Sequence, residues 1–285
     1  GCKVGERIRL RAILHHMTRK AGVGDPQKWI LLLHGILGAG GNWAGFAREL
    51  AESRPHYGVL VPDHRLHGRS ASGLPPDHLE ACILDLEKLL SEFDGEVSAV
   101  IGHSFGSKIG VEIAIRQPTI RQAFFLDAEP GPLPTIGKSR NDFQVLRLMD
   151  ALRAAPVNFT GRDEFVRYMG EFGFRPEIAG WVGKNLRRDD SGLKLNLDLD
   201  RIENLLMSHH DFDSWPRLSH PEVDQIDFIV GERSKVVTAE TREQLRELSN
   251  EQPERHALAV LQDAGHWLHV DQPRELLAKL LERLQ

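Results

Sequence analysis

The sequence predicts an α/β fold, in which a mostly parallel β-sheet is flanked by helices and one helical segment is inserted. Short, continuous apolar runs recur along the chain, and such runs are typical of parallel strands that are buried on both faces. Stretches with apolar residues at helical spacing lie between them, and this alternation predicts a sheet covered on both sides. The 285 residues are 41% hydrophobic and 27% charged, which is typical of a soluble globular protein with a large core.

The predicted strands follow the apolar runs. An outer, half-exposed strand is expected at 7–13, because apolar and charged residues alternate in "RIRLRAI". A last strand is expected at 256–261, where the sequence reads "HALAVL". The buried strands between them are "WILLL" at 29–33, "GVLVP" at 58–62, "VSAVIG" at 97–102, "AFFLD" at 123–127 and "IDFIV" at 226–230.

The predicted helices lie between these strands. Residues 79–93 repeat apolar side chains at helical spacing. A helix at 104–116 is expected to stop before the proline at position 118, because the residue before a proline avoids the helical conformation. Two more helices are expected at 238–248 and 273–284, the second with Asp271 as its N-cap.

Residues 131–218 break the alternation. They contain the helical stretches "DFQVLRLMDALRAA" and "DEFVRYMGEFG", several aromatic residues and no convincing buried strand. The segment is either a helical insertion with a small core of its own or a lid whose apolar underside faces a substrate, and both interpretations can hold. The predicted organisation is therefore a core of residues 1–130 and 219–285 with a helical lid insertion at 131–218.

Charge and cysteine content exclude several function classes. The net charge is −5, and no clustered positive charge predicts nucleic-acid or acidic-membrane binding. No apolar run approaches the roughly 18 residues that span a bilayer. Cys2 and Cys82 cannot form a disulfide framework, so we expect a buried thiol and a cytoplasmic protein, with a trimmed exported form as the alternative suggested by Gly1 and Cys2. No compact metal-binding motif occurs, and we expect neither a metal nor a cofactor.

The stretch "IGHSFGSKIG" at 101–110 suggests a nucleophilic serine. Ser104 lies between a predicted strand and a predicted helix, flanked two residues away by Gly102 and Gly106. A strained turn of this kind lifts the hydroxyl clear of the sheet edge and needs residues without bulk at both flanking positions. The spacing alone is a weak signal, and its place between strand and helix strengthens it.

A serine nucleophile needs a base and two oxyanion donors. The favoured base is His266 in "DAGHWLHVDQP", which follows the last predicted strand, and His269 is the second candidate. One oxyanion donor is the backbone N–H of Phe105, directly after the serine. The other is the N–H of Ile36 in the glycine-rich loop that follows the first buried strand.

Taken together, these motifs resemble one known family. The pieces "HG" at 34–35, "DHRLHGRS" at 63–70, "GHSFGS" and "AGHW" occur in the order found in α/β-hydrolases with a helical lid. The chain most closely resembles the esterase subgroup that includes bacterial YbfF and the abhydrolase domain-containing 11 type, as "NLDLDRIENLL" and "IVGERSKVV" also indicate. The resemblance implies the α/β-hydrolase fold and a serine esterase.

The third member of the triad is less clear from the sequence. In the wider family an acid usually follows a late strand, about three residues after a glycine, and Ser234 occupies that place here. Glu232 lies close by. The resembled subgroup carries an aspartate that matches Asp127 in "FFLDAEP", so the resemblance favours Asp127, with Glu232 as the alternative acid and Glu129 as a weaker candidate.

The expected function is that of a serine hydrolase of the carboxylesterase type, which cleaves carboxylic or thio esters through an acyl-enzyme. The expected partner is a small-molecule ester with an apolar acyl group. The alternatives are a receptor-like protein that binds a ligand, or a hydrolase of C–C, lactone or amide bonds. We expect Asp63, Arg65 and Ser70 to hold their loop by hydrogen bonds, and His34 and His103 to support the active loops.

Overall fold

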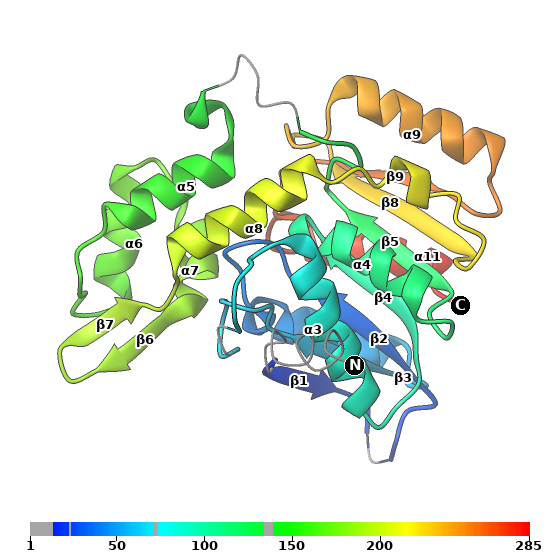
Figure 1. The fold of residues 1–285 in the computed structure, drawn as a ribbon, viewed down its shortest axis with the longest axis horizontal. Helices are drawn as coiled ribbons and strands as arrows, with labels where there is room; N and C mark the ends of the chain where they lie inside the picture. Colours follow the sequence, from blue (N-terminus) through cyan, green and yellow to red (C-terminus); the bar gives the residue numbers. More distant parts are fainter. Residues whose placement is uncertain (1–13, 23, 71–72, 134–138) are drawn as a thin grey trace, which may run out of the picture.

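The computed structural model describes residues 14–22, 24–70, 73–133 and 139–285. The predicted strand at 7–13 and Cys2 lie outside these residues. Within them, the chain forms a seven-stranded sheet with helices on both faces and an inserted segment on one side (Figure 1). The α/β fold predicted from the sequence is confirmed.

The sheet has the strand order β1-β3-β2-β4-β5-β8-β9, and only β1 runs antiparallel to its neighbour. All five buried strands were predicted to within one residue of their observed ends, whereas β9 begins two residues later than expected. The strands are β1 His16–Arg19, β2 Lys28–Leu33, β3 Tyr57–Pro62, β4 Val97–His103, β5 Gln122–Leu126, β8 Gln225–Gly231 and β9 Leu258–Leu261.

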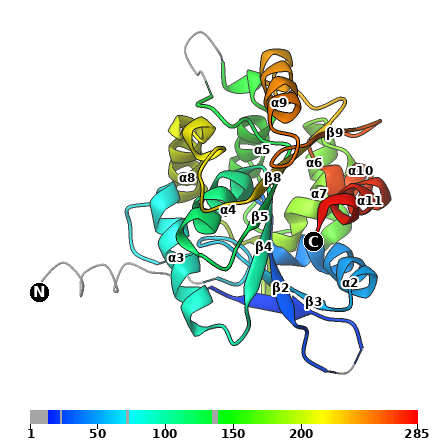
Figure 2. The same ribbon diagram turned by 90° about the vertical axis from the view of Figure 1, so that its right-hand side faces the viewer.

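Two sets of helices cover the two faces of the sheet (Figure 2). Successive residues of a strand point to opposite faces, so Leu31 and Leu33 pack with α3, α4 and α9, while Ile30 and Leu32 pack with α2 and α11. Both faces are therefore apolar, which explains the continuous apolar runs. These helices are α2 Ala44–Ser53, α3 Leu79–Glu92, α4 Phe105–Arg116, α9 Ala239–Glu251 and α11 Pro273–Arg283.

The predicted cap of the last helix is wrong. Gln272 is the N-cap of α11, and Pro273 takes the first helical position, where its missing N–H has no consequence. Asp271 ends the short helix α10 (Leu268–Asp271), so its backbone is already helical. Its carboxylate instead accepts a hydrogen bond from the Gly265 N–H at 2.8 Å and thereby supports the loop that carries His266.

The segment between β5 and β8 contains the two predicted helices and a hairpin that the sequence did not suggest. Each hairpin strand has only one buried residue, so no continuous apolar run marks it. The apolar side chains of this segment join the buried cluster beneath α3 and α4 and do not form a separate core. Its elements are α5 Gln144–Arg153, α6 Arg162–Glu171, α7 Pro176–Val182, β6 Leu186–Asp189, β7 Gly192–Leu195 and α8 Leu199–Asp211.

The described residues contain no helix with the length and apolar character needed to cross a membrane. They also contain no cluster of three or more His, Cys, Asp or Glu side chains that could hold a metal ion. Cys82 is a buried free thiol, as expected, and burial raises the pKa of that thiol. The cytoplasmic location stays a prediction.

Candidate active site

Ser104 lies on a strained turn between β4 and α4. Its φ of 53° and ψ of −116° belong to a region that residues with side chains rarely adopt. A Cβ atom at Gly102 would lie 2.3 Å from the carbonyl oxygen of Gly106, and one at Gly106 would lie 2.7 Å from that of Leu33. Gly102 is thus needed for the turn to close and Gly106 for α4 to begin against the end of β2, which agrees with the prediction that both positions must lack bulk.

We expect Gly102→Ala to destabilise the protein by about 3 kcal/mol or more, because the added methyl group overlaps backbone atoms that cannot move aside. The measurement is the free energy of unfolding in urea. Gly45→Ala in α2 is the matched control, since no described atom apart from its chain neighbours and the backbone of its own helix lies within 4 Å of its added Cβ. Alanine there should be neutral or stabilising by up to about 1 kcal/mol. Equal effects of the two substitutions would contradict this account of the turn.

Asp127 and His266 come together at the carboxyl edge of the sheet. Asp127 directly follows β5 with a φ of 46° and is completely buried. Its Oδ2 lies 2.7 Å from Nδ1 of His266, whose side chain is 14% exposed. Because a carboxylate only accepts hydrogen bonds, Nδ1 carries the proton of a neutral ring and Nε2 is left as the basic nitrogen.

Two groups from the β8 side also bind the Asp127 carboxylate. The Gly231 N–H donates to Oδ1 at 2.9 Å, and the Ser234 hydroxyl donates to Oδ2 at 2.5 Å. Ser234 stands where the wider family usually carries its acid, and here it holds the acid that comes from another strand. In the sequence, Ser234 was notable only because the usual acid is missing at its position. Its hydroxyl, which can donate to a carboxylate, was the feature that could have predicted this contact.

The alternative acids bind other partners. The Glu232 carboxylate accepts a hydrogen bond from the backbone N–H of Asp263 at 3.0 Å on the surface. The Glu129 carboxylate accepts hydrogen bonds from the Thr241 hydroxyl at 2.5 Å and from the Thr238 N–H at 3.3 Å. Neither carboxylate has a hydrogen bond to His266 among the described contacts.

The other histidines near the site have supporting positions. His269, the second candidate for the base, stacks on Trp43 with ring centroids 3.9 Å apart and does not line the cavity that contains Ser104. His103 donates a hydrogen bond from Nε2 to the carbonyl of His266 at 2.8 Å, which confirms its expected support of that loop.

The loop that carries Ile36 is held by neutral histidines. The Leu37 N–H donates to Nε2 of His67 at 2.9 Å, and Nε2 of His34 accepts from the His64 N–H at 3.0 Å. Burial lowers the pKa of His67 to about 3, so its ring stays an acceptor at neutral pH. The N–H groups of Ile36 and Phe105 have no protein acceptor among the described residues.

Hydrogen bonds hold the segment 63–70, as expected from the sequence. Asp63 accepts from the Gly40 N–H at 2.6 Å and from the Arg69 N–H at 2.9 Å. The Ser70 hydroxyl donates to the Asp63 carbonyl at 2.6 Å. These contacts brace the 3₁₀ turn of residues 40–43 against the loop that follows β3.

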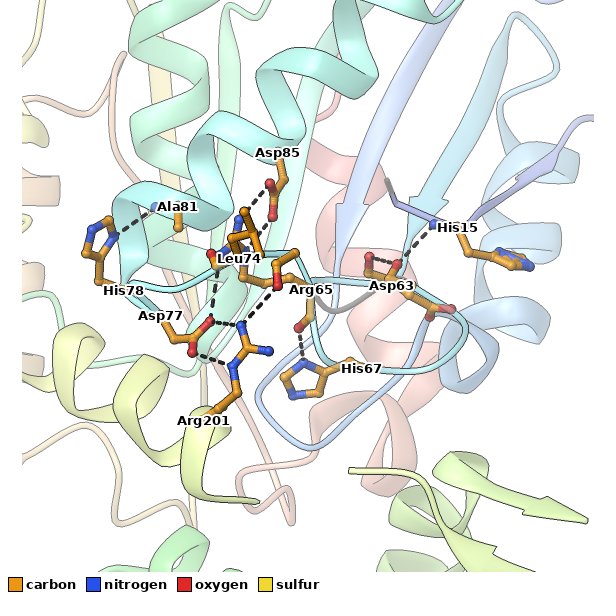
Figure 3. Close-up of polar contacts among 12 residues, drawn as sticks. His15, Asp63, Arg65, His67, Leu74, Asp77, His78, Ala81, Asp85 and Arg201 are labelled. Atoms are coloured by element: carbon orange, nitrogen blue, oxygen red, sulfur yellow. Dashed lines mark hydrogen bonds and ion pairs between the residues drawn. The ribbon is translucent and has the colours of Figure 1, made fainter. Parts of the chain in front are cut away.

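A buried ion-pair network joins this segment to α8 (Figure 3). Arg65 makes two contacts with Asp85, at 2.6 and 2.9 Å, and its guanidinium lies 3.7 Å from Asp77. Asp77 in turn accepts two hydrogen bonds from Arg201 of α8, at 2.6 and 2.8 Å. The network therefore fixes the N-terminal end of α8 to the loop after β3.

We expect Asp77→Asn to lower the free energy of unfolding by about 3 kcal/mol, because it removes the charge shared by two arginines from a buried position. The Asp77 side chain is only 2% exposed. Asp224→Asn is the matched control, since Asp224 forms an exposed two-contact pair with Arg121 and should cost less than about 1 kcal/mol. Urea unfolding checks both, and a small effect at Asp77 would mean that the network adds no stability.

A cavity of about 710 Å³ opens onto the predicted site. The core contributes Ser104, His266 and the two proposed oxyanion residues to its lining, while the inserted segment contributes both apolar and polar side chains. The apolar ones include Phe143, Leu148, Trp181 and Leu206, and the polar ones include Asp142, Arg147, Arg175, His209 and His210. The site thus lies between the carboxyl edge of the sheet and the inserted segment, with room for a small organic molecule.

Comparisons with known proteins agree with this architecture. Residues 30–280 match the family described as "Alpha/beta hydrolase family". The chain is 23% identical to the sn-1-specific diacylglycerol lipase ABHD11 of Danio rerio over 270 residues, which cover 93% of this chain and 80% of that protein. The Mus musculus protein of the same name is 24% identical over 252 residues, covering 87% and 78%. The solved structure titled "Marine microorganism esterase" superposes with a TM-score of 0.80 at 24% identity, covering 96% of this chain and all of that one.

Proposed function

Because the chain belongs to the alpha/beta hydrolase family, we propose that it is a serine hydrolase that cleaves carboxylic or thio esters through an acyl-enzyme. One observation carries the proposal: the strained Ser104 shares a cavity with His266, whose Nδ1 lies 2.7 Å from a buried carboxylate. A hydroxyl, a positioned imidazole and an orienting carboxylate are the three parts that acyl transfer to serine requires.

The proposed steps follow from this arrangement. Nε2 of His266 takes the Ser104 proton as the hydroxyl oxygen attacks the ester carbonyl, and the Asp127 carboxylate stabilises the imidazolium that forms. The N–H groups of Ile36 and Phe105 bind the oxyanion of the tetrahedral intermediate. His266 then protonates the leaving group, and it next activates the water that hydrolyses the acyl-enzyme.

The proposed domain division assigns residues 1–130 and 219–285 to the hydrolase core and 131–218 to a lid. The apolar side chains that this segment adds to the cavity, among them Phe143, Leu148 and Trp181, support an apolar acyl group. The relatives named diacylglycerol lipases make glycerol esters of fatty acids one substrate class to include in the assay.

The experiment combines labelling with turnover. We expect a fluorophosphonate probe to add one phosphonyl group to the wild-type protein, at Ser104 by peptide mass spectrometry. p-Nitrophenyl esters of increasing acyl length should be hydrolysed, and the chain length with the highest kcat/KM measures the acyl pocket. A folded protein that neither takes the label nor turns over any ester would favour the receptor-like alternative.

A further inference from the structure

The loop that carries the proposed oxyanion donor of Ile36 is a tight and strained turn. The Gly38 N–H donates to the Gly35 carbonyl at 3.1 Å, so the turn spans four residues. Leu37, its third residue, has a φ of 63°, in the left-handed region that glycine or asparagine normally occupies at this place in a turn. A leucine stays in that conformation only where its surroundings hold it there.

Two side chains hold the backbone of Leu37, one at its N–H and one at its carbonyl. Nε2 of His67 accepts from the N–H, as described above. The carbonyl accepts a hydrogen bond at 2.8 Å from Nδ2 of Asn185, which lies in the short 3₁₀ turn of residues 183–185 in the inserted segment. Asn185 is completely buried, and its Oδ1 accepts from the Gly68 N–H at 2.9 Å. Since a backbone N–H only donates and a carbonyl only accepts, these partners fix the orientation of the Asn185 amide.

The inserted segment also contacts this loop through Trp181. Asn42, at the end of the loop, donates from Nδ2 to the Trp181 carbonyl at 2.8 Å, and its Oδ1 accepts from the Ala39 N–H at 2.7 Å. A Cβ atom at Gly38 would lie only 3.0 Å from Cζ2 of Trp181, so the backbone of the turn packs directly against that ring. The inserted segment thus holds the turn that carries Ile36 by hydrogen bonds and by packing.

We propose that Asn185 is a positioning residue for the oxyanion donor of Ile36. The inference rests on the proposed function and adds that the inserted segment takes part in catalysis through this contact. The direction of the Ile36 N–H depends on the backbone of the turn, and Asn185 binds the carbonyl of the strained residue in that turn. An oxyanion donor acts where negative charge develops in the transition state, so a small displacement of the turn slows the reaction without weakening the binding of the ester itself.

Asn185→Asp tests this inference in the full chain with a side chain of the same size. A carboxylate keeps the acceptor for the Gly68 N–H but has no donor for the Leu37 carbonyl. We expect kcat for p-nitrophenyl butyrate to fall about 10- to 100-fold, because a small displacement of a reacting group has an effect of this size, while KM stays within about 2-fold. The inhibition constant of 1-butaneboronic acid, which forms a tetrahedral adduct with a catalytic serine, should rise by the same factor as kcat falls. Asn185→Ala also lacks the donor and should give the same pattern, and it takes the place of Asn185→Asp if the buried charge prevents folding.

Gln122→Glu is the matched control, because it also exchanges a buried amide for a carboxyl group, at the start of β5 and thus at the opposite edge of the sheet. Nε2 of Gln122 donates to the Gln225 side chain at 2.9 Å and to the Arg283 carbonyl at 3.0 Å. The substitution should lower the free energy of unfolding but leave kcat and the inhibition constant unchanged.

Three results would overturn this inference alone. They are a kcat within about 3-fold of wild type in both Asn185 variants, a fall in kcat that leaves the inhibition constant unchanged, or an equal loss of kcat in Gln122→Glu. Absence of turnover for every ester by the wild-type protein, together with no phosphonate label, would instead overturn the proposed function.

Discussion

Ser104→Ala is expected to lower kcat for p-nitrophenyl ester hydrolysis by roughly 10⁴- to 10⁶-fold, to the level left by the oxyanion donors and substrate binding alone. The substitution removes one oxygen atom and adds none, so the turn between β4 and α4 keeps its geometry. The free energy of unfolding should therefore change little, and the loss should appear in kcat. Steady-state kinetics, with protein concentration normalised by absorbance and folding checked by circular dichroism, makes the measurement.

The matched control is Ser98→Ala, on the strand β4 that leads to Ser104; its buried hydroxyl has no hydrogen-bond partner among the described residues and does not line the cavity. It should keep wild-type turnover and should still take the phosphonate label. Activity that persists in Ser104→Ala at even one hundredth of the wild-type rate would show that another group attacks the ester, and the proposed mechanism would be wrong.

The backbone supports the choice of these residues independently of their chemistry. Leu37, Ser104 and Asp127 all have positive φ values, of 63°, 53° and 46°, and none of them is glycine. Each such residue costs of order 1 kcal/mol or more, and such strain tends to concentrate at functional sites. Five non-glycine residues of the described part of the chain have a positive φ, and three of them are the proposed nucleophile, the proposed acid and the neighbour of a proposed oxyanion donor; the other two are Leu66 and Asp263.

Local sequence patterns predicted the sheet and the ends of its strands. Since parallel strands end at the same edge, residues that directly follow β4 and β5 had to lie near one another. That rule placed Ser104, Asp127 and His266 at one edge of the sheet, and the resemblance to the esterase subgroup favoured Asp127 as the acid. The need for Gly102 could be predicted because its cause is a contact with Gly106 within the same turn, whereas Gly106 is also constrained by the carbonyl of Leu33 on β2.

What the sequence did not predict depends on residues that are distant along the chain. The pairing of Ser234 with Asp127 spans 107 positions, and that of Arg201 with Asp77 spans 124. No periodicity within one segment encodes such a contact. The place of His209 in the cavity was missed for the same reason: its position at the end of an amphipathic helix is typical of a core residue, and only the packing of α8 on α4 brings it to the cavity that contains Ser104.

The second large effect on kcat is expected at Asp127, the favoured of the two candidate acids. Asp127→Asn is expected to lower kcat about 10⁴-fold with little change in KM. The Gly231 N–H donates to Oδ1 of Asp127, so the amide oxygen of the introduced asparagine takes that place and its NH₂ group faces Nδ1 of His266. Nδ1 must then become the acceptor and the proton moves to Nε2, which can no longer take the proton of Ser104.

Glu232→Gln is the comparison that separates the two candidate acids. In the wild-type protein the Glu232 carboxylate accepts a hydrogen bond from the Asp263 N–H at the surface, and the amide oxygen of the introduced glutamine can accept the same bond. Its kcat should stay within about 3-fold of wild type, since no hydrogen bond links it to the site. A larger loss of kcat in Glu232→Gln than in Asp127→Asn would instead identify Glu232, which follows β8, as the acid. A larger loss of kcat in Asp127→Asn would mean that the acid of this chain follows β5. Ser234, at the position after β8 where the wider family carries its acid, would then hold the Asp127 carboxylate in place.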